Sequence, residues 1–219
     1  MSKKLKIYLS IIYIIFLIAF TILGYKYAVD FELFNVLFLL LTLLFISNFS
    51  LLFNAMTEIT TSMNLPVLIP AFVVLNPFWV GIVAAIGTIE MSFSKKSFIW
   101  YKFLFNRAVF FLAASSSALV FKLGRSFFDG NTFPILSILF AILIYFLINN
   151  LLVYIVINLS KSDVNKFSLL NYFRELSKNL ITSYFIGLIL LASYVTFGKS
   201  FFILVIILLF IIKDFFYSR

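Results

Sequence analysis

The chain has 219 residues, of which 64% are hydrophobic and only 11% are charged, and its mean hydropathy is +1.17. A soluble domain of this length could not bury so much apolar surface, so the composition predicts an integral membrane protein whose solvent is lipid. Apolar runs of about 20 residues favour helices over a membrane β-barrel, whose strands would be shorter and would alternate polar and apolar residues. We therefore predict one all-α membrane domain over residues 1–219, with no soluble domain.

The residue types present also limit the chemistry that the chain can perform. It contains no Cys and no His, which excludes thiolate and imidazole metal ligands, cysteine nucleophiles and histidine general bases. Carboxylates are few and scattered, so we predict no enzymatic activity, no metal and no cofactor. The net charge of +9 indicates membrane topology and not nucleic-acid binding, because membrane proteins concentrate Lys and Arg in their cytoplasmic loops.

The first predicted span is Ile7–Ala28, preceded by the basic segment MSKKLK, and the second is about Phe31–Phe53. The first is too long for the apolar core of a cleaved signal peptide, and no small-residue cleavage site follows it. We therefore predict an uncleaved span whose N-terminus is cytoplasmic. Lys26, Asp30 and Glu32 form a short outer turn between the two spans.

The most irregular stretch is 58–96, where a polar run leads into an apolar piece with two prolines and then into Asn76–Pro77. Proline removes a backbone donor and disfavours helix at the residue before it. In a bilayer, irregular backbone survives only where protein or a water-filled cavity satisfies the freed groups. We therefore predict a short, broken or partly extended membrane segment at about 63–75. The alternative is an ordinary loop between two spans.

The positions of the basic residues favour a crossing at 63–75. With this crossing, 13 of the 17 Lys and Arg residues are cytoplasmic and four are outside, as the positive-inside rule requires. The prediction is then a polytopic bundle of about seven or eight membrane segments in the cytoplasmic membrane, with both termini cytoplasmic. The later spans are about 77–93, 103–121, 134–159, 180–197 and 200–212, with a tight outer turn at Gly198–Lys199.

One connection has a pattern of its own. Phe167, Leu170, Phe173 and Leu176 recur at three-residue spacing, which predicts an amphipathic helix on the inner membrane surface. The helix is either a simple connector between spans or a coupling point for a cytoplasmic partner.

Small residues gather on two consecutive predicted spans. Small residues at four-residue spacing let membrane helices approach closely, and serines can hydrogen-bond across such a contact. We predict that these two helices pack tightly against each other, and the alternative is that the serines line a cavity. The residues chosen for this packing are Gly81, Ala85, Gly87 and Ser116.

Polar residues inside membrane segments are expensive and therefore mark candidate sites. Glu90 and Arg107 should lie at similar depth on adjacent helices, so we predict an ion pair, unless both side chains extend to the inner surface. Asn149 and Asn150 interrupt an apolar span, and an amide there usually bonds to a neighbouring helix.

The broken stretch also supplies candidate ligand-binding residues. Carboxylate, hydroxyl and amide groups close together could coordinate a cation or a small polar molecule, although an exposed inner loop explains them equally well. The residues are Glu58, Thr60, Thr61, Asn64 and Asn76.

Three stretches of the chain carry a resemblance to a known family. They are LPVLIPAFVVLNPFWVGIVAAIGTI, WYKFLFNRAVFFLAASSSALVF and LIYFLINNLLVYIVINL, and the resemblance that they carry covers about residues 65–197. They resemble the membrane domain that precedes HD-GYP and GGDEF output domains in bacterial cyclic-di-GMP signalling proteins. Asn76–Pro77 stands where that family has Gly-Pro, and Gly87 ends the small-residue helix. Phe105–Asn106 fits its Phe-Asn pair, and Asn149 or Asn150 fits its later asparagine.

The resemblance implies a non-enzymatic sensor or scaffold that couples a ligand or a membrane signal to a cytoplasmic partner. No output domain follows Arg219, so it implies either a stand-alone relative or a catalytic unit on another chain. The same pattern is similar to substrate-binding subunits of energy-coupling-factor vitamin transporters. That similarity implies a different function, in which the chain binds a small molecule and docks on a coupling subunit. A purely structural membrane protein is the third possibility.

Overall fold

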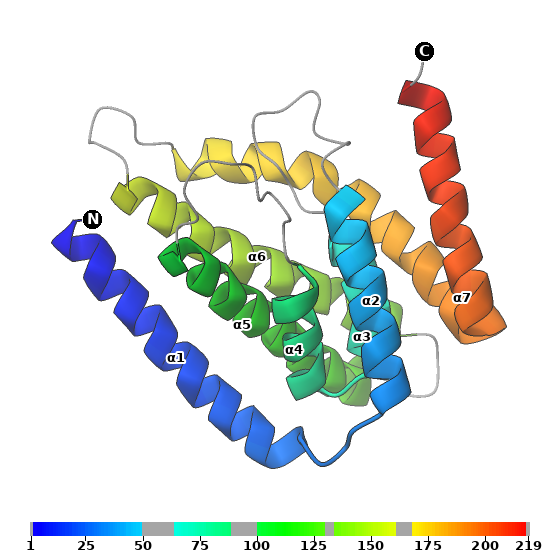
Figure 1. Cartoon of the computed structure of the whole chain (residues 1–219), viewed down its shortest axis with the longest axis horizontal. Coiled ribbons are helices and arrows are strands. Elements are labelled where there is room, and N and C mark those ends of the chain that lie inside the picture. Colours follow the sequence, from blue (N-terminus) through cyan, green and yellow to red (C-terminus); the bar gives the residue numbers. More distant parts are fainter. Residues whose placement is uncertain (1, 50–63, 89–99, 130–133, 161–167, 218–219) are drawn as a thin grey trace.

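In the computed structural model, every secondary-structure element among the described residues is a helix (Figure 1). The structure describes residues 2–49, 64–88, 100–129, 134–160 and 168–217. Four helices are long and apolar enough to cross a membrane, and the prediction of an all-α chain with membrane-length helices is confirmed for this part. These four are Lys3–Tyr27, Trp100–Phe127, Ile135–Ser160 and Tyr184–Leu208, the last of which includes the reversal at Gly198 described below.

The helices run back and forth between two ends of a bundle (Figure 1). We call the end where α1 starts the N-terminal end, and the opposite end, with the α1–α2 connection at residues 28–32, the turn end. In chain order the elements are α1 (Lys3–Tyr27), α2 (Leu33–Phe49), α3 (Asn64–Val74), α4 (Pro77–Gly87), α5 (Trp100–Gly124), the π-helical turn η2 (Arg125–Asp129), α6 (Ile135–Ser160) and α7 (Leu169–Tyr217).

The short helix α3 lies at the centre of this bundle. Val67, Leu68, Ile69 and Ala71 are completely buried, and Phe72 is 2% exposed. A helix that is apolar on all sides is stable only where it is covered on all sides. In this structure α2, α5, α6 and α7 each contact α3. Its 11 residues rise about 16 Å, roughly half of a hydrocarbon core of about 30 Å.

The two prolines of α3 lie inside the helix and do not end it. Pro66 lies in the first turn, where backbone N–H groups have no intrahelical acceptor, and Pro70 lies further along. The chain leaves the helix at Leu75 and Asn76, and Pro77 then begins α4. The prediction of a break at Asn76–Pro77 is confirmed. The partly extended form of the segment is wrong over residues 64–74, which are helical.

Glycine reverses the direction of α7. Gly198 has φ 81° and ψ −174°, a conformation open almost only to glycine. Figure 1 shows that the chain turns back sharply within α7, so that the last part of α7 runs away from the turn end. The predicted tight turn at Gly198–Lys199 is therefore confirmed.

The predicted amphipathic helix is the continuous first part of α7, not a separate element. Leu170, on its predicted apolar face, is 77% exposed. Phe173, on the same face, packs edge-on against Phe146 of α6, with ring centroids 5.7 Å apart. Of the two side chains of this face that the structure describes, Phe173 therefore contacts the bundle and Leu170 is exposed, whereas Phe167 and the side chain of Leu176 lie outside the described part.

We expect Gly198→Ala to lower the free energy of unfolding by about 1–3 kcal/mol, because a Cβ atom is strained at this positive φ. No atom lies within 4 Å of the added Cβ, so the loss comes from the backbone and not from a clash. Denaturation in mixed micelles measures it, with the exposed Ser200→Ala as the neighbouring control. Equal stability of the two variants would contradict the assignment.

Candidate functional site

Asn76 attaches the turn between α3 and α4 to the turn between α1 and α2. Its Oδ1 accepts a hydrogen bond from the backbone N–H of Trp79 at 3.1 Å, which caps the N-terminus of α4. Its Nδ2 donates to the carbonyl oxygens of Tyr27 at 3.1 Å and Asp30 at 2.7 Å. One side chain thus satisfies the start of a half-length helix and two carbonyls at the turn end.

Arg107 of α5 caps the other end of α4. Its guanidinium donates to the carbonyl oxygen of Ala85 and, at 3.0 Å, to that of Thr88. Carbonyls at a helix C-terminus lack intrahelical donors and carry the negative end of the helix dipole, so a cation is the favourable partner. The rings of Phe103 and Phe110 lie 5.0 and 5.7 Å from the guanidinium carbon and add a cation–π contribution.

The predicted ion pair between Glu90 and Arg107 cannot be placed, since Glu90 lies outside the described residues. Arg107 is partly buried and directs its guanidinium to the end of α4.

Helices α4 and α5 touch where α4 has a glycine. A Cβ built on Gly81 would lie 2.1 Å from Oγ of Ser115 and 2.7 Å from the ring of Phe111. Only a residue without a side chain permits this approach. Ser115 is buried, whereas Ser116, which the sequence singled out, is only partly buried. The serine that faces Gly81 is therefore one position earlier than expected.

The other two small residues of α4 have different neighbours. A Cβ on Gly87 would lie 2.8 Å from a Cδ atom of Leu43, so this glycine admits α2 and not α5. Ala85 is 9% exposed and belongs to a cluster with Phe78 and Phe111. Small residues thus let α4 approach two helices on different sides.

The predicted ligand-binding residues do not form one cluster within the described part of the chain. Glu58, Thr60 and Thr61 lie outside it, and so does the side chain of Asn64. Asn64 begins α3 and Asn76 follows its other end, which separates the two residues by about 16 Å. Asn76 already makes three hydrogen bonds, so its evident role is to anchor the turn.

The paired asparagines of α6 behave differently from each other. Asn150 donates to the carbonyl oxygen of Phe146 at 2.8 Å, so within the described part of the chain its amide bonds to its own helix, whereas the sequence suggested a bond to a neighbouring helix. Oδ1 of Asn149 is buried and has no hydrogen-bond partner in the described structure.

Tyr145, which the sequence analysis missed, precedes Asn149 by one helical turn. Its hydroxyl is also buried without a described partner, and its ring centroid lies 6.3 Å from that of Phe72 in α3. Residues four apart share a helix face, which is the signal that could have paired Tyr145 with Asn149. Buried polar atoms without partners cost about 1–3 kcal/mol each, which makes this pair unusual within the described part of α6.

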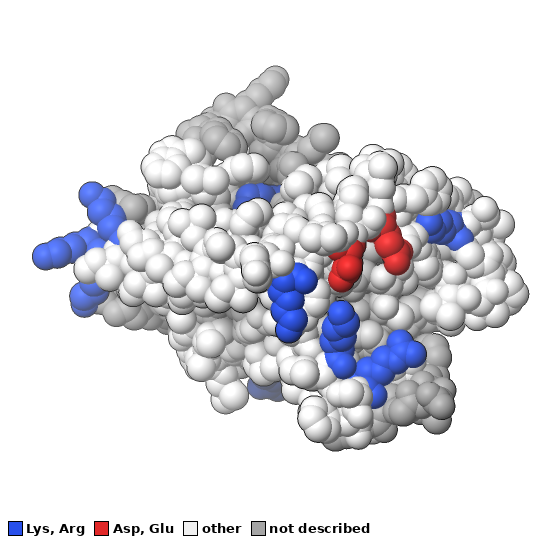
Figure 2. Space-filling view, turned by 90° about the horizontal axis from the view of Figure 1, so that it is seen from below, with Lys and Arg blue, Asp and Glu red and all other residues white. Residues whose placement is uncertain are grey.

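Charged and aromatic side chains connect the helices at the turn end. Figure 2 shows acidic side chains gathered at one place on this face, with basic side chains around them. Glu32 accepts a hydrogen bond from Asn35, whose Oδ1 accepts another from the Tyr194 hydroxyl at 3.1 Å. Nζ of Lys199 lies 3.9 Å above the ring of Phe34. Helix α2 is thereby joined to both sides of the Gly198 turn.

Comparison of the chain with protein-family models, with curated proteins and with solved structures finds no match.

Replacing Arg107 with Met should lower the free energy of unfolding by about 2–3 kcal/mol, because two carbonyls at the end of α4 lose a charged donor. Arg107→Lys should recover only part of this loss, since an ammonium group lacks the planar fork that reaches both oxygens. Denaturation in mixed micelles gives the values, with the exposed Arg125→Met as the control. A full recovery by Lys would show that charge alone matters.

Replacing Gly81 with Leu should destabilise the protein by about 1–3 kcal/mol or more through overpacking against α5. The smaller change Gly81→Ala should be partly rescued by Ser115→Gly, which removes the Oγ atom that the new Cβ would meet. Ile86→Leu, at a position 44% exposed on the same helix, is the control. Additive effects of the two changes would argue against a direct contact.

Proposed function

We propose that the chain is a non-enzymatic multi-pass membrane domain of the sensor or scaffold type, which couples a ligand or a membrane signal to a cytoplasmic partner. In this proposal the turn end faces outward, the N-terminal end lies at the cytoplasmic surface of the cell membrane, and both termini are cytoplasmic. The distribution of basic residues supports this orientation. The α3–α4 pair adds two short membrane elements to the longer helices, so the bundle has seven or eight membrane segments.

The observation that carries the proposal is the close contact of α3 with α7. A Cβ built on Gly187 of α7 would lie 2.1 Å from Cδ1 of Ile69 in α3. Ile69 is completely buried, so α3 cannot shift or rotate far without moving this part of α7. Helix α7 then passes through Gly198 and ends at Tyr217, on the side where a cytoplasmic partner would be.

A signal can enter this arrangement at either end of the α3–α4 pair. Asn76 connects the pair to the outer turns, and Arg107 fixes the inner end of α4 to α5. Both attachments are hydrogen bonds whose partners another polar group could replace, whereas the centre of α3 is closely packed. A ligand that binds more tightly to the protein with one arrangement of these hydrogen bonds than with another would shift the population of α7 positions.

A second candidate function is a substrate-binding subunit of a transporter. The observation that favours it is the pair of buried polar atoms on Tyr145 and Asn149, which a bound small molecule would satisfy beside α3. Native mass spectrometry of the gently purified chain tests it. A co-purified vitamin-sized molecule that is lost in Tyr145→Phe supports transport, and an empty protein argues against it.

Single cysteines test the orientation directly, because the chain has none of its own. Asp30→Cys at the turn end and Lys102→Cys at the N-terminal end are both at exposed positions. We expect an impermeant thiol reagent to label the first in intact cells and the second only after the membrane is opened. The opposite pattern, or labelling of both from one side, would contradict the proposed topology.

A label on the last part of α7 tests the coupling. Ile207 is 51% exposed, so Ile207→Cys accepts a fluorophore or spin label without disturbing the core. We expect Asn76→Ala to change the mobility or accessibility of this label, since it releases the α3–α4 turn. Thr21→Ala, which removes a hydroxyl that donates within α1, is the matched control. If Asn76→Ala lowers stability but leaves the label unchanged, the coupling is absent.

A further inference from the structure

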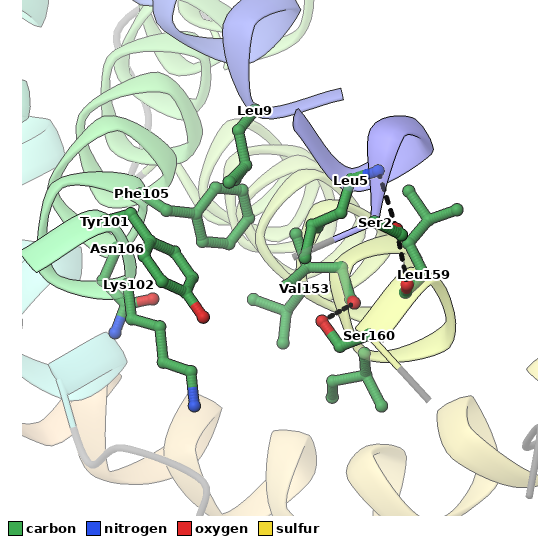
Figure 3. Close-up of a pocket in the computed structure, with 12 residues that line it drawn as sticks. Ser2, Leu5, Leu9, Tyr101, Lys102, Phe105, Asn106, Val153, Leu159 and Ser160 are labelled. Atoms are coloured by element: carbon green, nitrogen blue, oxygen red, sulfur yellow. Dashed lines mark hydrogen bonds between the residues drawn. The ribbon is translucent and has the colours of Figure 1, made fainter. Parts of the chain in front are cut away.

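A cavity of about 790 Å³ opens at the N-terminal end of the bundle, away from α3 and α4 (Figure 3). Its walls come from the start of α1, the start of α5 and the end of α6. Three helices that are far apart in the sequence therefore build one groove, and it lies at the level where α1 begins.

The inner walls of this groove are apolar. Leu5 and Leu9 of α1 are 4% exposed, Phe105 of α5 is 3% exposed, and Val153 and Val156 of α6 face them. These side chains belong to one hydrophobic cluster between α1, α5 and α6. The described lining thus presents apolar side chains from three helices.

The mouth of the groove is polar and basic. Figure 3 shows Lys102 and Asn106 of α5 on one side, and Ser2 and Ser160 on the other. Lys3, Lys4 and Lys6 are exposed on the neighbouring turn of α1. The acidic side chains whose exposure the structure describes, Asp30 and Glu32, both lie at the turn end. Among the described residues, the charged side chains at and beside the mouth are therefore basic, which favours a negatively charged ligand.

Hydrogen bonds between helices fix the walls. The Tyr8 hydroxyl donates to the carbonyl oxygen of Leu152 at 3.1 Å and joins α1 to α6. The Tyr13 hydroxyl donates to the carbonyl oxygen of Tyr101 at 2.9 Å and joins α1 to α5. Because α1 is attached to both neighbours, the groove is formed before anything binds, and little ordering of the protein is needed on binding.

We propose that this groove binds one anionic phospholipid from the leaflet at the N-terminal end. An acyl chain lies along Leu9, Phe105 and Val153, and the phosphate lies between Lys102 and the capped start of α1. Basic pockets between membrane helices on the cytoplasmic side are suited to such headgroups. The site is separate from the α3–α4 pair and requires only that this end lies at a membrane surface.

Lipid titration of the full-length chain, followed by native mass spectrometry, tests the proposal. The probes are phosphatidylglycerol, phosphatidylcholine with the same acyl chains, and free glycerol phosphate. We expect phosphatidylglycerol to bind at least about fivefold more tightly than phosphatidylcholine, and Lys102→Gln to lower its affinity by about fivefold, the effect of one lysine near an anionic surface. Free glycerol phosphate should not bind at the same concentrations, since the acyl contacts are missing.

Two further variants separate the headgroup from the acyl chain. Val153→Trp fills the apolar wall and should weaken both phospholipids. Lys199→Gln, at the turn end, should change neither. Equal binding of the two lipids, or unchanged phosphatidylglycerol affinity in both Lys102→Gln and Val153→Trp, would overturn the proposal. Binding of free glycerol phosphate as tight as that of the lipid would show a phosphate site instead, and would also overturn it.

Discussion

The structure depends on hydrogen bonds to the unpaired backbone groups at the two ends of α4, a half-length helix in an apolar bundle. Helix α4 has 11 residues and spans only about half of the hydrocarbon core, so its N-terminal end meets the turn between α1 and α2 while its C-terminal end stops beside Arg107 of α5. Asn76 accepts from the first turn, and Arg107 donates to the carbonyls of the last turn. Without these two side chains, backbone groups at the two ends of α4 and at the α1–α2 turn would lose hydrogen-bond partners, and each buried group left unpaired has a substantial free-energy cost.

The close packing around α3 and α4 has a matching cause. A short helix buries little area of its own, so its stability comes from close contact with its neighbours. Gly81 lets α4 approach α5, Gly87 lets it approach α2, and Gly187 lets α7 approach α3. Membrane helices gain little from the hydrophobic effect between them, so van der Waals contact at small residues is the main attraction. Capping and small-residue packing therefore both contribute to the stability of these short helices.

The two proposed sites use different parts of this architecture. The α3–α4 pair is central, closely packed and connected to α7, which suits the transmission of a shift in position. The groove between α1, α5 and α6 is peripheral, open and basic at its mouth, which suits a component of the membrane itself. Helix α5 contributes to both, since Arg107 caps α4 and the preceding turns line the groove.

The sequence by itself determined the all-helical class, the membrane-length apolar segments, the break at Asn76–Pro77 and the turn at Gly198. Each of these follows from local properties: the length of an apolar run, the missing donor of proline and the positive φ that glycine tolerates.

Only the tertiary structure decided which groups meet. In the structure, Gly81 lies against Ser115, and Arg107 donates to the carbonyls at the end of α4. Asn64 and Asn76 lie at opposite ends of α3. Residues 2–9, 101–106 and 153–160 come together to line the groove. Helices that are apolar on every side carry no periodic signal for their orientation, so their rotation and neighbours are set by packing.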